Sequence, residues 1–156
     1  MTPAVNAARR AGIGFRLHSY DHDSSVTAYG EEAAEKLGVD RRQMFKTLVV
    51  DLDDRELAVA LVAVSDQLNL KLFAEALGAK KAKMADPKAA QRATGYLLGA
   101  ISPLGQKKRL KSVIDARASA LNTIFVSAGR RGLQIELAPA DLVALIDGRF
   151  APIAQL

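Results

Sequence analysis

Hydrophobic and polar residues follow one another in a pattern that predicts five short helices. Thr2 followed by Pro3 is typical of an N-cap with proline at the first helical position, and Gly12 ends that helix. The other four segments combine good helix formers with a glycine or a proline at one boundary. The predicted helices span residues 3–11, 31–37, 71–77, 87–94 and 139–146.

Shorter apolar runs predict strands between these helices. Two runs rich in Leu and Val are separated by Asp53-Asp54, which predicts an antiparallel pair. Two other runs flank Gly129-Arg130-Arg131-Gly132, which predicts a hairpin, and the last run is typical of an edge strand. The predicted strands span residues 15–20, 44–52, 57–64, 112–114, 123–127, 133–137 and 150–153.

The chain has 156 residues, the usual length of one domain, and it contains no internal repeat, low-complexity segment or linker-like stretch. Helices and strands are interspersed, so we predict a single α+β domain over residues 1–156 with a mixed β-sheet flanked by helices. Only 5% of the residues are aromatic and Trp is absent, so Val, Leu, Ile and Ala must build the core.

Composition restricts the chemistry that the chain can perform. It has no cysteine, which excludes a disulfide framework, a thiolate zinc site and a cysteine nucleophile of its own. Its only histidines, His18 and His22, straddle a strand end and a loop, where the four-residue spacing does not converge, so we expect no metal site. No serine lies in a nucleophile-elbow pattern.

The charge balance is basic, with a formal net charge of +5 and a pI of about 9.6. This balance suits an anionic partner, although a merely solvated basic surface explains it equally well. Two clusters that suit phosphate contacts are Lys107-Lys108 and Arg130-Arg131. The amino terminus has no apolar signal core and no stretch is long enough to span a bilayer, so we expect a cytoplasmic protein with no membrane partner.

Lys46 is the first candidate for a functional side chain. In the predicted strand 44–52 it shares one face with Met44, Leu48 and Val50, where an ammonium group needs a partner. The structural interpretation is a lysine near a strand end that extends to solvent. The functional interpretation is a fixed positive charge at the mouth of a pocket, which holds a phosphate or a developing negative charge.

The second candidate is the segment 95–105, in which three glycines and a proline surround a short apolar run with one hydroxyl. Such a segment can offer backbone N–H groups to an oxyanion, or it can be an ordinary tight connection. It is not a Walker loop, because Gln106 stands where that motif requires lysine.

Taken together, these segments resemble the YbaK family of Cys-tRNA(Pro) deacylases, relatives of the editing domain of bacterial prolyl-tRNA synthetase. The resemblance extends over nearly the whole chain. The blocks that carry it are Met1-Thr2-Pro3-Ala4, His18-Ser19-Tyr20-Asp21-His22-Asp23, Phe45-Lys46-Thr47-Leu48, Lys80-Lys81-x-Lys83-Met84-Ala85-Asp86, Ser102-Pro103-Leu104-Gly105-Gln106-Lys107-Lys108-Arg109 and Arg131-Gly132-Leu133.

The resemblance implies a largely antiparallel, barrel-like sheet and an enzyme that acts in trans beside prolyl-tRNA synthetase, with the 3′ end of aminoacyl-tRNA as substrate and no cofactor or metal. Lys46 matches the family's essential lysine. The segment 99–103 matches the family's Gly-x-x-x-Pro loop. The residues that the resemblance places at or near the substrate pocket are Tyr20, Tyr29, Thr47, Gly99, Ala100, Ile101, Ser102, Pro103, Ser127 and Gly129.

The mechanism that the resemblance implies is substrate-assisted, because the thiol of the bound cysteine attacks its own ester carbonyl and the tRNA leaves. An intramolecular nucleophile has a high effective concentration, so the protein need only fold the substrate and stabilise charge. The sequence departs from the family at three pocket positions: Tyr29 replaces phenylalanine, Ala100 replaces a glycine, and Gln134 replaces an aspartate of some members.

Two alternatives stay open at this point. The same pocket can clear another mischarged amino acid, such as alanine, through an activated water. Alternatively, the chain is a non-catalytic module that binds tRNA ends or nucleotides, with the basic clusters supplying the affinity. The sequence does not indicate the oligomeric state.

Overall fold

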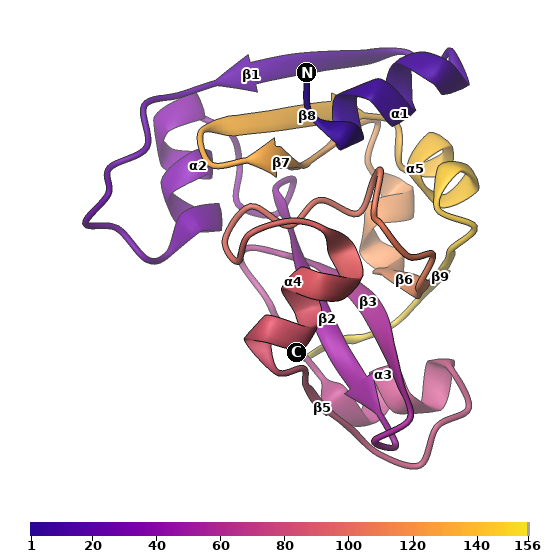
Figure 1. Cartoon of the computed structure of the whole chain (residues 1–156). Helices are drawn as coiled ribbons and strands as arrows, with labels where there is room; N and C mark the ends of the chain where they lie inside the picture. The colour runs from indigo at the N-terminus through magenta and orange to yellow at the C-terminus, as the bar shows by residue number, and fades with distance from the viewer. Residues whose placement is uncertain (156) are drawn as a thin grey trace.

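The computed structural model describes residues 1–155 and contains five α-helices and a short 3-10 helix in that range (Figure 1). The five predicted helices are confirmed, and their ends differ from the prediction by no more than two residues. Side chains cap three of them, as where the Thr2 hydroxyl accepts a 3.2 Å bond from the Val5 N–H. The helices are α1 (Pro3–Ala11), α2 (Tyr29–Leu37), α3 (Leu70–Ala76), α4 (Pro87–Thr94), η1 (Ala116–Ala120) and α5 (Pro139–Leu145).

Ten strands run between these helices within residues 1–155, and seven of them match the predicted strands. The three that the sequence did not predict, β4, β5 and β10, have only two or three residues each. The strands are β1 (Phe15–Ser19), β2 (Phe45–Leu52), β3 (Glu56–Ala63), β4 (Gln67–Leu68), β5 (Ala82–Met84), β6 (Lys111–Asp115), β7 (Ile124–Arg130), β8 (Leu133–Leu137), β9 (Arg149–Ala151) and β10 (Ala154–Gln155).

These strands are divided into three sheets. The largest has the order β5-β2-β3-β6-β9, in which β2 pairs antiparallel with β3 and β5, whereas β3-β6 and β6-β9 are parallel. A second sheet, β1-β8-β7, is antiparallel, and β4 pairs with β10 in the third. The α+β class and the mixed sheet are therefore confirmed, and β9 is the predicted edge strand.

One contact between the two larger sheets determines where a site can form. An isolated bridge joins Met44, just before β2, to Phe125 of β7, and the Phe125 N–H also donates to the Gln43 carbonyl at 3.0 Å. Both residues belong to a small apolar cluster that packs beneath α2. In Figure 1, α2 and the loop before it lie beside the ends of β1, β7 and β8. The start of β2 therefore faces the β7-β8 hairpin.

Candidate active site

A cavity of about 490 Å³ opens between α2, the start of β2, the β7-β8 hairpin and the segment after α4. This volume lies within the roughly 300–1,000 Å³ range of small-molecule sites. Apolar side chains form much of the wall, and charged and hydroxyl groups interrupt it. The lining residues are Tyr20, Thr27, Ala28, Tyr29, Gly30, Glu31, Met44, Phe45, Lys46, Thr47, Leu48, Val64, Leu98, Gly99, Ile101, Ser127, Arg130, Arg131 and Gln134.

Lys46 lies on β2 opposite Val62 of β3 and is half-buried in the cavity wall. Its ammonium group makes no hydrogen bond or ion pair with any group of residues 1–155. Burial lowers the pKa of this amine, whereas the charges of Glu31 and Asp66 act in the opposite direction. An ammonium that is partly desolvated and unpaired is suited to bind an anionic group.

Two buried oxygens in the same wall also have no hydrogen-bond partner among residues 1–155: Thr47 Oγ1 and Gln134 Oε1. Gln134 is only 7% exposed. Both oxygens are covered by neighbouring atoms, and leaving such a group unpaired costs about 1–3 kcal/mol, so each becomes an acceptor for a ligand once the wall moves to uncover it. Nearby, burial is the main influence on Tyr20 and raises the pKa of its phenol above 10.0, which keeps the hydroxyl protonated.

The segment after α4 brings its backbone to the cavity at Gly99. Gly99 has a φ of +85°, and a Cβ at this position would overlap the Tyr29 ring, so only glycine fits. The N–H groups of Gly99 and Ile101 donate to no acceptor within residues 1–155. Two residues that line the cavity beside the aromatic ring therefore have main-chain donors without a partner in this range, which is the kind of group that an oxyanion site requires.

Ser127 of β7 is held in place from both sides. Its hydroxyl donates to the Ala100 carbonyl at 3.0 Å and accepts a 3.1 Å bond from the Gly129 N–H. The register of β7 against β8 shifts between Ser127 and Arg130, and this irregularity turns the Gly129 amide toward the serine. Ser127 thus fixes the glycine segment to the hairpin.

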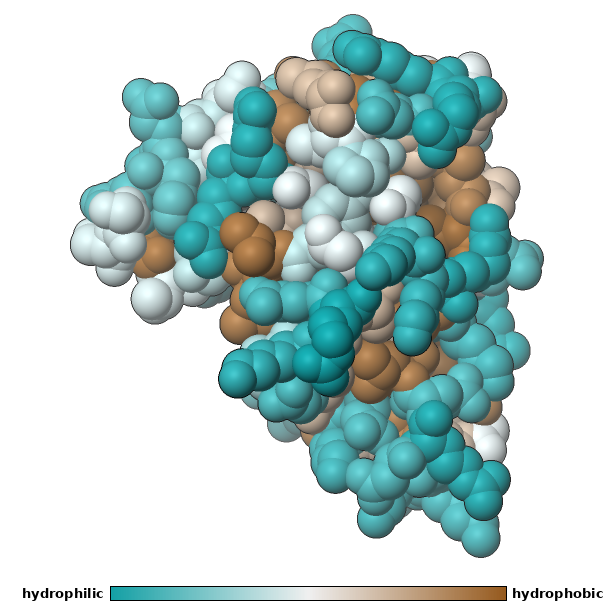
Figure 2. Space-filling view, in the orientation of Figure 1, coloured by the Kyte–Doolittle hydropathy of each residue, from teal (hydrophilic) through white to brown (hydrophobic). Residues whose placement is uncertain are grey.

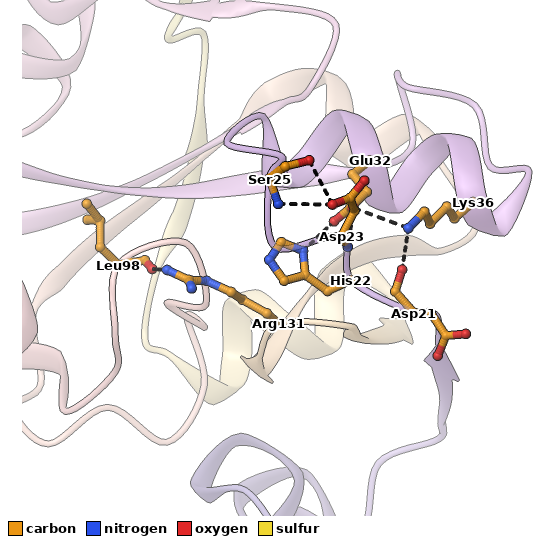
Figure 3. A network of polar contacts seen from close by, with 8 residues as sticks. All are labelled: Asp21, His22, Asp23, Ser25, Glu32, Lys36, Leu98 and Arg131. Atoms are coloured by element: carbon orange, nitrogen blue, oxygen red, sulfur yellow. Dashed lines mark hydrogen bonds and ion pairs between the residues drawn. The ribbon is translucent and has the colours of Figure 1, made fainter.

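Arg131, at the hairpin turn, reaches across the mouth of the cavity. Its guanidinium carbon lies 4.7 Å from the centre of the Tyr29 ring. One of its N–H groups donates to the Leu98 carbonyl at 2.8 Å (Figure 3). The adjacent Arg130 also lines the cavity but contacts no acidic side chain of residues 1–155.

Residues 23–145 match the family described as "Aminoacyl-tRNA editing domain". The chain belongs to this family. The editing domain is 40% identical over 135 residues to the "Putative Cys-tRNA(Pro)/Cys-tRNA(Cys) deacylase EbsC" of Enterococcus faecalis, and the match covers 86% of this chain and 79% of that protein.

Two further similarities concern prolyl-tRNA synthetase. The editing domain is 35% identical over 102 residues to a proline–tRNA ligase of Shouchella clausii, covering 65% of this chain but only 18% of the ligase. It also superimposes on the solved structure of a "putative trans-editing enzyme for prolyl tRNA synthetase" with a TM-score of 0.86 at 22% identity, covering 99% and 96% of the two chains. This second likeness confirms the fold.

The structure of the editing domain brings nine of the sequence-predicted residues to one cavity. They come from the end of β1, α2, β2, the glycine segment and the β7-β8 hairpin, which lie far apart in the chain. These residues are Tyr20, Tyr29, Lys46, Thr47, Gly99, Ile101, Ser127, Arg130 and Arg131.

Four predicted pocket residues do not line this cavity. The backbones of Ala100 and Gly129 instead form hydrogen bonds with the hydroxyl of Ser127, which does line it. Ser102 is fully buried, and its hydroxyl accepts a 3.2 Å bond from the Leu104 N–H, while Pro103 lines a separate hollow. After Ile101 the chain turns into the core, so the positions expected at the pocket end at that residue.

Lys107 and Lys108 also lie outside the cavity. Both side chains are exposed, and their backbone N–H groups donate to Thr94 and Ala93 at the end of α4. Their role as phosphate contacts stays a prediction.

The sequence did not indicate one buried network beside the cavity. Glu32 of α2, whose side chain is 3% exposed, accepts a 2.6 Å bond from His22 and a 2.9 Å bond from the Asp23 N–H, and it pairs with Lys36 at 3.3 Å (Figure 3). The His22 ring lies 5.6 Å from the Tyr29 ring. The network therefore supports one wall of the site.

The histidines have different carboxylate partners, because His18 contacts Glu136 at 2.9 Å whereas His22 contacts Glu32. Among residues 1–155, no three His, Asp or Glu side chains are grouped as metal ligands. The helices of the same range are all too short or too polar to cross a membrane.

Proposed function

We propose that this editing domain removes cysteine from mischarged Cys-tRNA(Pro), acting in trans, with the substrate's own thiol as nucleophile. The observation that carries the proposal is the unpaired, half-buried ammonium of Lys46 in a cavity that also holds the free amides of Gly99 and Ile101. The relative from Enterococcus faecalis carries the same activity in its name.

In this reaction the sulfur of the cysteinyl group attacks the ester carbonyl carbon. The C–S bond forms as the bond to the ribose oxygen breaks, and the thiol proton ends on that oxygen, which leaves tRNA with a free hydroxyl and a cysteine thiolactone that water opens. The protein supplies no nucleophile, in agreement with its lack of cysteine. The amides of the glycine segment bind the carbonyl oxygen as it gains charge, and Lys46 binds the terminal phosphate or ribose.

The tRNA body needs a surface beyond the cavity. Exposed cations at the end of α4 and in the segment after it have no ion-pair partner among residues 1–155: Arg92, Lys107, Lys108 and Arg109. Figure 2 shows strongly hydrophilic residues gathered over α4 on this face. Cations in this arrangement suit the phosphates of an acceptor stem, and prolyl-tRNA synthetase is the partner from which the domain receives its substrate.

The deciding experiment compares three substrates on the same proline tRNA: the cysteinyl, S-methylcysteinyl and alanyl esters. We expect rapid release of cysteine alone, because a methylated sulfur cannot form the thiolactone and alanine has no nucleophile. Uncatalysed hydrolysis of each ester is the control. Release of S-methylcysteine or alanine at a comparable rate overturns the thiol route in favour of water, and tight tRNA binding without any release identifies a binding module.

A further inference from the structure

Arg130 and Arg131 are adjacent arginines that differ in one respect. Both are exposed, both line the mouth of the cavity, and both were predicted to contact tRNA phosphates. Among residues 1–155, only Arg131 of the two has partners, the Leu98 carbonyl and the Tyr29 ring. A guanidinium already engaged by an aromatic ring and a carbonyl is poorly placed to serve as a free phosphate contact.

The two contacts of Arg131 use features that only a guanidinium combines. Its Cζ lies over the Tyr29 ring, 4.7 Å from the ring centre, while one of its N–H groups donates to the Leu98 carbonyl at 2.8 Å. An ammonium group is a point charge on a flexible stem and does not satisfy both contacts in one fixed geometry.

Both partners of Arg131 adjoin the backbone that faces the substrate. Leu98 directly precedes Gly99, and the Tyr29 ring lies so close to Gly99 that no side chain fits there. From the other direction, the His22 ring lies 5.6 Å from the Tyr29 ring. The buried carboxylate of Glu32 in turn holds His22 (Figure 3). A continuous series of contacts thus runs from α2 through Tyr29 and Arg131 to the glycine segment.

We propose that Arg131 is a positioning residue, which holds Leu98 and Gly99 so that their backbone receives the ester of the aminoacyl-tRNA. This inference rests on the proposed deacylase function. It assigns the two arginines different roles: Arg131 orders the site through Leu98 and Tyr29, whereas Arg130 provides charge to the tRNA.

The test uses Arg131→Ala and Arg131→Lys in steady-state deacylation of Cys-tRNA(Pro). We expect both variants to lose about five- to thirty-fold in kcat with little change in KM, because one charge-assisted hydrogen bond and one cation–π contact are lost. Lysine keeps the charge but not the planar geometry, so it should not rescue the activity. A lysine variant that behaves like the native protein overturns the proposal.

Arg130→Ala and Arg130→Lys are the matched controls. As a phosphate contact, Arg130→Ala should raise KM at unchanged kcat and reduce the salt dependence of tRNA binding by about one unit of slope, and lysine should restore both. If Arg131→Ala instead shows this pattern, Arg131 is a phosphate contact and the positioning role is wrong.

Hydrogen–deuterium exchange gives a readout that does not require activity. We expect faster exchange in residues 97–101 of both Arg131 variants and native exchange there in Arg130→Ala, with unfolding temperatures confirming that all variants are folded. Unchanged exchange in the Arg131 variants overturns the inference whatever the enzyme does. If the native protein deacylates none of the three esters, the proposed function fails, and the exchange result still reports whether the contact orders the segment.

Discussion

The polar groups at the two ends of the β2-β3 hairpin differ in whether they have hydrogen-bond partners. At the turn, the Asp53 carboxylate accepts bonds from the N–H groups of Lys80 and Lys81, the latter at 2.8 Å. At the other end, the Lys46 ammonium and the Thr47 hydroxyl have no partner among residues 1–155. Both ends belong to the same pair of strands, so the pairing of the backbone does not cause the difference.

This contrast separates polar groups that stabilise the fold from polar groups that bind a ligand. An unpaired buried group costs about 1–3 kcal/mol, which a paired group avoids. The turn needs its pairs because Asp53 and Asp54 both have a φ of 55°, a conformation that non-glycine residues rarely adopt. The cavity end has no such turn, and under the proposed function a substrate would satisfy its free groups.

Lys46→Met is the strongest test of the difference between the unpaired groups at the cavity and the paired groups at the turn. We expect deacylation to fall by about 10²-fold, since the cation that binds the terminal phosphate or ribose, and so positions the ester, is removed. The unfolding free energy should stay equal or rise by about 0.5–1 kcal/mol, because a partly desolvated charge is replaced by an apolar side chain. Rates measured on Cys-tRNA(Pro) and urea unfolding check the two effects.

The pH dependence of Lys46→Met gives a further check. The folded pKa of Lys46 lies below 10.5, so the unfolded chain binds more protons between the two values and the native protein gains stability as pH rises through that window. The stability advantage of the methionine variant should therefore shrink toward pH 10.5. Lys71→Met, on the exposed face of α3, is the matched control, and a fall in stability specific to Lys46→Met contradicts the comparison.

Glu32→Gln tests a paired group that lies beside the cavity. We expect a loss of about 2–4 kcal/mol in unfolding free energy, because the buried charge holds both His22 and Lys36. Burial alone would raise the pKa of the Glu32 carboxyl, but the hydrogen bonds from His22, the Asp23 N–H and Lys36 outweigh it and leave the pKa below 4.5.

The sign of this shift fixes the pH window of the Glu32 contribution. Its stabilisation is fully present above the unfolded value of 4.5 and is lost as pH falls through the lower folded pKa. Chemical unfolding of native and Glu32→Gln proteins should thus differ at pH 7 and converge in acid. Glu35→Gln, on the exposed side of the same helix, should cost little, and an equal loss there would assign the effect to the helix instead of the network.

Asp53→Ala examines the turn itself. We expect it to lower the unfolding free energy, since two backbone N–H groups lose their acceptor and alanine tolerates a positive φ poorly. Asp53→Asn should recover part of this loss, because asparagine keeps an acceptor oxygen and adopts this conformation more readily. Thermal unfolding measures both variants. Deacylation by the folded proteins should be native, and a lowered rate would show that the turn affects the site.

The same contrast explains how much of the fold the sequence could predict. Helix α1 was predicted to the residue because its signals are local: the Thr2 cap, Pro3, and Gly12 with a φ of +69°. Strands β4 and β10 were missed because each has two residues and depends on a partner across the chain, as in the pairing of Leu68 with Ala154. Two residues show no periodicity that a sequence can reveal.

The residues of the candidate site also differ in whether the sequence could predict them. Lys46 was predicted because a lysine among apolar strand neighbours conflicts with its own surroundings, which is visible in the sequence. The contact of Arg131 with the Leu98 carbonyl joins residues 33 positions apart, and neither residue type alone indicates the other. Ser102 was expected at the pocket because the family resemblance implied it, but its hydroxyl accepts a bond from the Leu104 N–H within its own turn.

Thr47→Val gives the smallest expected effect and the finest test of the comparison. Valine has nearly the shape of threonine without the hydroxyl, so removing the unpaired Oγ1 should leave the unfolding free energy equal or raise it by about 0.5–1 kcal/mol. Deacylation should fall by about three- to ten-fold, because the substrate loses one acceptor.

Thr123→Val is the matched control, since the Thr123 hydroxyl donates to Glu136 at 2.6 Å and its loss should destabilise the fold. If the Thr47→Val protein is less stable yet fully active, the hydroxyl stabilises the fold and does not bind substrate.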